Sequence, residues 1–413
     1  MINWDKLGVR PADILLPETR DITRWGCVAC DQFTSDGEYW DAMEDYVGDA
    51  PSTLRITFPE IYLGKDDEKY ISSINACMRD YLARGIFKEY KGAIIKCERT
   101  LRNGSVRSGL VMAVDLEAYD YSAGSQSMIR ATEGTIVHRL PPRIAIRKDA
   151  PLELPHIMIL IDDPNNTVIG NVSGAEVYNT PLAMNGGSIK GSLLSPDEHK
   201  TVADALARLA DQKDFATKYG LDESTAPLVY AMGDGNHSLA CAKACWENLK
   251  KELSPEEQAN HPARYALAEI VNLYDESLQF EPIHRVVFDV DAEKLISEIS
   301  VNDGVSVTVI TENGEKTVTV KKTNELAVGS LQDALDAYME KNGGRIDYIH
   351  EPETVAKLGS QAGNVGFILP EFDKSQLFPA VISSGALPRK TFSMGEGCDK
   401  RYYFEARRIK YVI

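Results

Sequence analysis

The sequence lacks any long hydrophobic run. No apolar stretch is longer than five residues, the length of Ile157–Ile161, whereas a helix that crosses a bilayer needs about 20. The first residues also lack the basic and apolar regions of a secretory signal. These absences argue against a membrane protein and predict a cytoplasmic one.

The sequence has fewer basic than acidic residues. The chain has 45 Lys and Arg residues against 62 Asp and Glu residues, a net charge of −17. Binding to nucleic acid depends on clustered cations that neutralise phosphates, so the composition argues against a nucleic-acid partner. The excess of acids also accounts for solubility without any partner.

Cysteines are few, and their number is odd. There are seven, and an odd count without a secretory signal indicates reduced thiols. The pairs Cys27/Cys30 and Cys241/Cys245 have spacings that can hold zinc, the second with His237 four residues before it. Buried thiols acting as small hydrophobes are the favoured alternative, so zinc is not expected.

The length of 413 residues predicts two or three domains, or one large domain with an insertion. The pattern predicts an α/β (α+β) fold, a mixed sheet with flanking helices. Residues 1–290 are expected to form the main domain, 291–345 a small inserted β-rich subdomain, and 346–413 a segment that completes the main domain. Helices are expected at 38–46, 66–84, 197–219, 238–251, 255–269 and 330–342, and strands at 93–100, 105–115, 156–162, 226–232 and 278–290.

The clearest functional candidate is the turn between the apolar strand 226–232 and the helix that follows it. Gly233 and Gly235 allow the backbone to approach a ligand. The helix N-terminus beyond them suits phosphate. Asp234 is suited to a metal or a ribose hydroxyl, His237 to a phosphate, and Lys243 can reach a ligand that lies alongside the helix. The alternative is a plain connection in which Asn236 or Ser238 caps the helix.

A second candidate is the basic region that follows residue 129. Arg130, Thr132 and Glu133 begin it, and four further cations follow: His138, Arg139, Arg143 and Arg147. Such a cluster predicts an anion-binding surface, in which Glu133 stays ionised and acts as a general base or metal ligand. The alternative is a solvated basic face that balances neighbouring acids.

Two weaker candidates remain. His284 and Arg285 open a strand, where a guanidinium can grip a phosphate or simply pair with an acid. Residues 185–192 are rich in glycine and predict a flexible loop that closes over a ligand, but the position of Lys190 rules out a Walker A sequence. The sequence contains no GxSxG, HExxH or GxGxxG motif of the common hydrolase, zincin and dinucleotide classes.

Five separated segments carry a resemblance to a known family. In order they are VACDQF, RATEGT, ELPHIMILIDDP, GDGNHSLA and EPIHRVV, and they resemble the uncharacterised bacterial family called domain of unknown function 1015. That family is distantly similar to the ParB/sulfiredoxin-like superfamily, which includes nucleotide-dependent free serine kinases. The resemblance implies a ParB/sulfiredoxin-like core.

The resemblance also implies roles for single residues. Asp234, Gly235 and His237 match a DGHHR motif that contacts nucleotide phosphates, while Asn236 and Ser238 depart from it. Since Ser238 stands where the motif has arginine, Lys243, Arg130 or Arg285 would have to supply the missing charge. Glu133 matches the Glu of an HE-x-T segment, and His284-Arg285 match a P-x-HR segment.

The implied activity is phosphoryl transfer between ADP or ATP and a small hydroxy compound, with free L-serine or O-phosphoserine as the leading candidate. Mg²⁺ would bridge the nucleotide and Asp234, and Glu133 would orient the attacking hydroxyl. One alternative is a nucleotide- or metabolite-binding regulator without catalysis. Another is a zinc- or thiol-dependent protein that uses Cys27 and Cys30.

Overall fold

The structure is a computed structural model that describes residues 2–122, 124–134, 140–154, 156–323, 326–388, 390–395 and 397–411. The chain forms two compact units. The large unit comprises Met1–Ala131, Thr135–Leu278 and Glu396–Ile413, and the small unit comprises Thr132–Gly134 and Gln279–Gly395. None of the described helices is long and apolar enough to cross a membrane.

In the described part of the large unit, ten strands form one mixed sheet with the order β10-β11-β4-β5-β13-β9-β12-β7-β6, and β1 pairs with β5. The strands are β1 (Val9–Arg10), β4 (Ile95–Thr100), β5 (Val106–Asp115), β6 (Tyr119–Asp120), β7 (Ile129–Arg130), β9 (Met158–Ile161), β10 (Ala175–Pro181), β11 (Ser188–Leu193), β12 (Tyr230–Asp234) and β13 (Tyr265–Asn272). The pairs β13/β9, β12/β7 and β7/β6 are parallel, and the other pairs are antiparallel. The predicted mixed α/β fold is confirmed.

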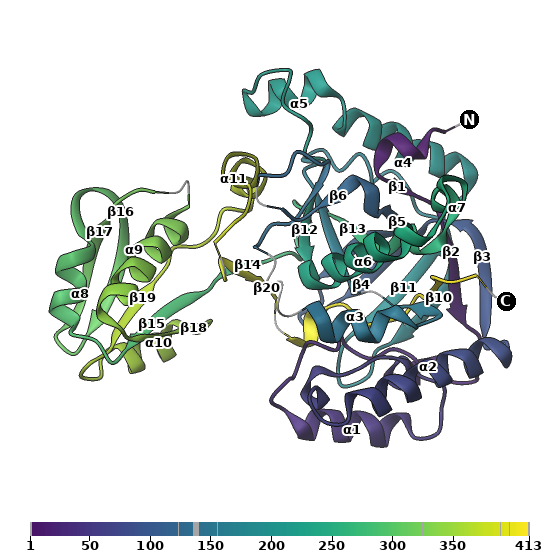
Figure 1. Ribbon diagram of the computed structural model, residues 1–413, viewed down its shortest axis with the longest axis horizontal. Helices are drawn as coiled ribbons and strands as arrows, with labels where there is room; N and C mark the ends of the chain where they lie inside the picture. The colour runs from purple at the N-terminus through teal and green to yellow at the C-terminus, as the bar shows by residue number, and fades with distance from the viewer. Residues whose placement is uncertain are drawn as a thin grey trace. The chain divides into compact units, whose positions relative to one another are not determined.

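Helices cover both faces of this sheet (Figure 1). They are α1 (Gly37–Val47), α2 (Asp67–Ala83), α3 (Leu140–Lys148), α4 (Pro196–Leu209), α5 (Gln212–Tyr219), α6 (Asn236–Leu249) and α7 (Pro255–Asn260). Because side chains alternate along a strand, Val111 and Ala113 of β5 belong to the core with α1 and α2, whereas Leu110, Met112 and Val114 belong to the core with α4 and α6.

The C-terminal segment of the chain packs into the large unit. β21 (Arg407–Arg408) pairs with β8 (Leu152–Glu153), and β2 (Ala12–Pro17) pairs with β3 (Phe87–Ala93). The buried Arg401 pairs with Glu269 and Glu405 at 2.7 Å each, and the buried Arg407 pairs with Glu153 at 2.7 Å. These ion pairs anchor the C-terminal segment against the sheet.

Three local predictions in the large unit were wrong. The expected helix 255–269 ends at Asn260 as α7, and β13 follows, because all eight residues of β13 are buried between β5 and β9 and pairing overrides helical propensity. The loop expected at 185–192 is largely strand β11, which pairs with β10 and β4. The helix expected at 197–219 is interrupted, since Asp211 caps α5.

The small unit has its own five-stranded sheet with the order β17-β16-β19-β15-β18. Its elements are β14 (Phe280–Pro282), β15 (His284–Phe288), α8 (Ala292–Ile299), β16 (Ser300–Thr311), β17 (Gly314–Val320), α9 (Ala327–Asn342), β18 (Arg345–Ile349), α10 (Pro352–Gly359), β19 (Val365–Ile368), α11 (Leu377–Ser384) and β20 (Phe392–Met394). The predicted insertion 291–345 is therefore too short. Strands β15 and β19 flank it in sequence and pair with each other in the same sheet, so the unit extends over 279–395.

Candidate functional site

The glycine-rich turn lies where the sequence predicts it, between β12 and α6. β12 ends at Asp234, and α6 begins at Asn236. Gly235 is the N-cap of the helix in the left-handed conformation, with φ +82°. Since Asn236 and Ser238 lie inside α6, neither is the N-cap residue that the alternative of a plain connection expects.

Glycine is required at position 235 for two reasons. A positive φ is unfavourable for other residues. A Cβ atom there would also stand 3.1 Å from Cα of Ile157, which belongs to the segment that leads into β9. The close approach of these two backbones brings the start of β9 against the turn.

Asp234 is held on both oxygens. Its Oδ1 accepts a hydrogen bond from the backbone N–H of Gly235 at 2.9 Å, and its Oδ2 pairs with Nζ of Lys400 at 3.2 Å. The side chains of Lys400 and Asp234 are 14% and 23% exposed, so both reach the surface. A cation from the far end of the chain therefore stands beside the turn.

His156 comes two residues before Met158, which lies opposite Asp234 in the antiparallel pair of β9 and β12. Its Nε2 is 3.5 Å from Oδ2 of Asp31, and its Nδ1 is 3.0 Å from the hydroxyl of Tyr403. The segment that carries Asp31 is fixed to the C-terminal segment by a hydrogen bond of 3.0 Å from the N–H of Ala29 to the carbonyl of Arg401. We call Asp31, His156, Asp234 and Lys400 the acid–base cluster.

The charges in this cluster affect one another. Burial opposes ionisation of Asp31, but His156 and Lys400 outweigh it and hold the pKa of that carboxyl well below its usual range. Burial also opposes the charge on His156, but Asp31, Asp234 and Glu60 outweigh it and raise the pKa of the imidazole. The cluster therefore favours an ionised carboxylate beside a charged imidazolium.

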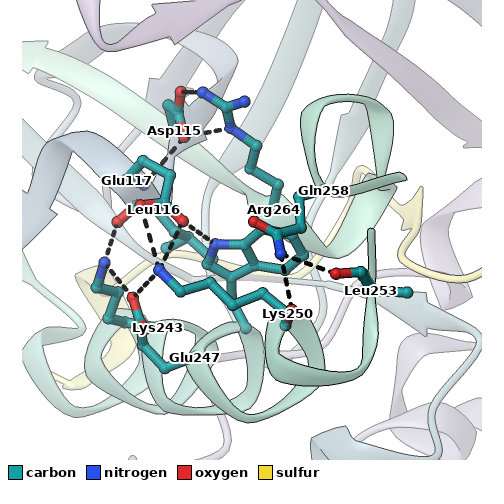
Figure 2. A network of polar contacts seen from close by, with 10 residues as sticks. Asp115, Leu116, Glu117, Lys243, Glu247, Lys250, Leu253, Gln258 and Arg264 are labelled. Carbon is teal, nitrogen blue, oxygen red and sulfur yellow. Dashed lines mark hydrogen bonds and ion pairs between the residues drawn. The ribbon is translucent and has the colours of Figure 1, made fainter. Parts of the chain in front are cut away.

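Lys243 does not reach toward the turn. Its Nζ donates a hydrogen bond to the carbonyl of Leu116 at 2.8 Å and pairs with Glu247 at 2.7 Å. Figure 2 shows it within a network of polar contacts that also includes Lys250 and Glu117. This placement argues against the predicted phosphate contact, and Lys400 offers its charge at the turn instead.

The basic region after residue 129 is not one surface. Arg130 is buried and donates to the carbonyls of Ser127 at 2.7 Å and Ala226 at 3.0 Å. Arg143 contacts Glu60, and Arg147 pairs with Glu153 at 2.5 Å. Arg143 and Arg147 thus have the acidic partners that the alternative expects, whereas Arg130 donates to backbone carbonyls. Thr135, His138 and Arg139 lie outside the described residues.

Thr132 and Glu133 belong to the small unit. The carbonyl of Thr132 accepts a hydrogen bond from the N–H of Leu387 at 2.6 Å, and Glu133 forms a parallel bridge with the same residue. Glu133 is partly exposed. Its predicted role as a base stays a prediction.

His284 and Arg285 are both buried in β15 of the small unit. Nδ1 of His284 accepts a hydrogen bond from the N–H of Leu369 at 3.1 Å, and burial lowers the pKa of the imidazole. The guanidinium of Arg285 donates to the carbonyl of Lys390 at 2.9 Å and lies over the ring of Tyr348. Because Arg285 is fully enclosed, the structure argues against the predicted grip on a phosphate.

Among the described residues, no group of three or more His, Cys, Asp and Glu side chains is arranged to hold a metal ion. Burial raises the pKa of the Cys27 thiol to about 11 and that of Cys30 further. Zinc binds the thiolate form, so this environment disfavours a zinc site at the first cysteine pair. The expectation that the protein carries no zinc stays a prediction.

The sequence matches the family described as protein of unknown function (DUF1015) over residues 9–338, and the chain belongs to that family. No curated protein matches it. Among solved structures it is similar to a conserved hypothetical protein from Pyrococcus furiosus, with 12% identity, a TM-score of 0.33, and 70% of this chain and 95% of the other covered. It is similar to a free serine kinase in complex with AMP, with 9% identity, a TM-score of 0.37, and 71% and 92% covered. It is also similar to a C-terminally truncated SbnI from Staphylococcus aureus, with 11% identity, a TM-score of 0.35, and 69% of this chain and 83% of the other covered.

Proposed function

We propose that this member of the DUF1015 family transfers a phosphoryl group between ADP or ATP and a small hydroxy compound. The observation that carries the proposal is the turn at the start of α6, where the Asp234–Lys400 pair stands beside a helix N-terminus. Free L-serine or O-phosphoserine is the leading substrate. That choice rests on the resemblance to the ParB/sulfiredoxin-like superfamily.

The physical argument concerns the nucleotide phosphates. A helix N-terminus presents backbone N–H groups and a partial positive charge to an anion. At this turn Gly235 keeps side-chain atoms away from the backbone, and the ammonium of Lys400 adds a full charge. Phosphoryl transfer asks mainly for positioning and charge stabilisation, and these groups supply both.

Mg²⁺ fits this site only together with a nucleotide. In sites that bind nucleotides the ion takes one or two carboxylates and completes its shell with phosphate oxygens and water. Asp234 offers one carboxylate, and the described residues bring no full ligand set around it. When bound there, the ion would neutralise charge on the transferring phosphoryl group, and Asp234 would be its protein ligand.

Nucleotide binding is tested by thermal unfolding. ADP or ATP with Mg²⁺ should raise the melting temperature of the wild type, since a ligand that binds only the folded state stabilises it. Asp234→Asn, His237→Ala and Lys400→Gln should each reduce that shift. Lys243→Gln is the matched control, because it removes an ammonium whose partners are Leu116 and Glu247, and it should keep the wild-type shift.

The outcome separates phosphoryl transfer from a nucleotide-binding regulator, two of the functions that the sequence left open. If nucleotide shifts none of the proteins, the phosphate site does not exist. If the turn variants and Lys243→Gln all respond like the wild type, nucleotide binds elsewhere. If the shift behaves as expected but no substrate turns over, the chain is a nucleotide-binding regulator without catalysis.

A further inference from the structure

We propose that Asp31 orients the attacking hydroxyl of the substrate, and that His156 positions Asp31 for this work. The assignment rests on the proposed phosphoryl transfer. It gives the hydroxyl a carboxylate in the same unit as the turn, whereas Glu133 belongs to the small unit. Neither Asp31 nor His156 was among the candidates expected from the sequence.

The first argument is placement. Lys400 pairs with Asp234 at 3.2 Å and also acts electrostatically on Asp31. His156 stands 3.5 Å from Asp31 and also feels the charge of Asp234. Asp31 therefore lies close enough to the turn for its carboxylate and that of Asp234 to act on the same lysine and the same imidazole.

The second argument is accessibility. The side chain of Asp31 is 31% exposed, whereas that of His156 is 7% exposed. Asp31 can therefore contact a substrate, and His156 lies behind it. On Oδ1 the carboxylate accepts one hydrogen bond from Nε2 of Gln32 at 2.9 Å. An ionised carboxylate has about four acceptor positions, so acceptor capacity is left for a hydroxyl.

The third argument is the hydrogen bonding behind His156. The hydroxyl of Tyr403 donates to Sγ of Cys30 at 3.0 Å and accepts a bond from the N–H of Cys30 at 3.3 Å. The same hydroxyl lies 3.0 Å from Nδ1 of His156, and the tautomer of the ring decides which of the two atoms donates. The Tyr403–Cys30 contact thus fixes the orientation of His156.

The charged groups around His156 favour the charged form of its ring. Asp31 and Glu60 come from the N-terminal segment, and Asp234 comes from β12. Arg143 contacts Glu60, and Lys400 pairs with Asp234, so each of these two acids has its own cation. Asp31 is left as the carboxylate that His156 itself contacts.

The proposed step transfers the terminal phosphoryl group of the nucleotide to the hydroxyl of the substrate. The hydroxyl oxygen of the substrate forms a bond to the terminal phosphorus of the nucleotide, while the bond from that phosphorus to the leaving nucleotide oxygen breaks. The hydroxyl proton passes to the carboxylate of Asp31 and from there to water. Because the imidazolium holds the pKa of Asp31 low, the carboxylate does not retain the proton, and its main contribution is to align the hydroxyl.

The test compares Asp31→Asn with Asp41→Asn, an exposed acid on α1 that serves as the matched control. The readouts are phosphoryl transfer from Mg²⁺-bound ADP or ATP to L-serine, and to water when no acceptor is added. We expect Asp31→Asn to slow both by roughly a hundredfold or more, as for loss of a general base, and to keep the nucleotide-dependent rise in melting temperature. Asp41→Asn should match the wild type.

His156 is tested by its pH dependence, which a purely structural residue would not alter. The wild-type rate should fall as the pH rises through the pKa of His156, which lies above its ordinary value of about 6.5. His156→Gln keeps an N–H donor without a titrating ring. It should be slower and should lose this alkaline decline.

Several results would overturn the assignment. Asp31→Asn could retain the rate of Asp41→Asn, or Glu133→Gln could show the large loss in its place. An unchanged pH profile in His156→Gln would overturn the positioning role of His156. If Asp31→Asn does not fold, this pH profile is the measurement that tests the proposal. A wild type that binds no nucleotide would overturn the proposed function itself, which the thermal shift reports separately.

Discussion

Replacing Gly235 with alanine should destabilise the large unit more than the same change at Gly220. Both glycines are helix caps in the left-handed conformation, Gly235 with φ +82° before α6 and Gly220 with φ +64° after α5. A Cβ at Gly220 meets no atom within 4 Å, whereas one at Gly235 stands 3.1 Å from Cα of Ile157. Gly220→Ala therefore measures the backbone cost alone, and Gly235→Ala adds the contact at the turn.

The two costs can be estimated separately. The left-handed conformation costs a non-glycine residue about 1–2 kcal/mol. Forcing atoms into a packed space adds about 1–3 kcal/mol. We therefore expect a loss of about 1–2 kcal/mol for Gly220→Ala and about 2–5 kcal/mol for Gly235→Ala.

Urea unfolding followed by tryptophan fluorescence measures this difference, because all four tryptophans lie in the large unit. The midpoint should fall further for Gly235→Ala at an unchanged slope. Gly235→Ala should also abolish the nucleotide-dependent thermal shift, which Gly220→Ala should retain. Equal midpoints, or a full nucleotide shift in Gly235→Ala, would show that backbone packing at the turn is not what shapes the site.

Three further predictions concern stability. Arg407→Met leaves the buried Glu153 with one ion-pair partner fewer and should cost about 3–5 kcal/mol in urea unfolding; a loss below about 1 kcal/mol would contradict this. The Asp31–His156 pair should stabilise the fold most between about pH 4 and pH 6.5. Because the pKa of Asp31 is lowered, the contribution of its carboxylate is lost as the pH falls below this window. Because the pKa of His156 is raised, the contribution of its imidazolium is lost as the pH rises above the window. The difference in stability between wild type and His156→Gln, measured against pH, should follow that course, and a flat difference would refute it. Replacing residues 291–345 with a Gly/Ser linker removes β16 and β17 from their sheet and should unfold the small unit while the tryptophan signal keeps its transition; resistance of residues 346–395 to protease would contradict this.

Local patterns in the sequence predicted the features that depend on neighbouring residues. The strands expected at 93–100 and 105–115 form the hairpin of β4 and β5, and Gly104 in its Asn-Gly turn has the positive φ that such a turn needs. The strand, glycine turn and helix around Gly235 were predicted for the same reason. A glycine between an apolar run and a helical pattern predicts a turn by itself, because glycine adopts backbone conformations that other residues disfavour.

Features that depend on distant residues could not be predicted in this way. Lys400 has no local pattern that points to Asp234, and only the long-range pairing of the C-terminal segment brings it there. Asp31 and His156 stood in two of the segments that carry the family resemblance, but nothing local showed that they meet. Arg285 was misjudged because its charge suggested a surface role, while its burial depends on both neighbours of β15.

The same limit explains the error at the domain boundary. The change in composition at residue 291 marks exposed, polar strands rather than the edge of a folding unit. Strands β15 and β19 are largely buried, as the strands of the main domain are, yet they lie in the interior of the small sheet. Composition follows exposure to solvent, whereas unit boundaries follow contacts.

Mass spectrometry of a small-molecule mixture with Mg²⁺ and ADP or ATP tests the central claim most directly. The account predicts that the wild type converts one hydroxy compound, with L-serine as the first to examine, into a product heavier by one phosphoryl group, and that an equal amount of nucleotide loses one phosphoryl group. Asp31→Asn should form this product far more slowly. Nucleotide that binds the turn while every metabolite stays unchanged would contradict the account and leave a binding protein without catalysis.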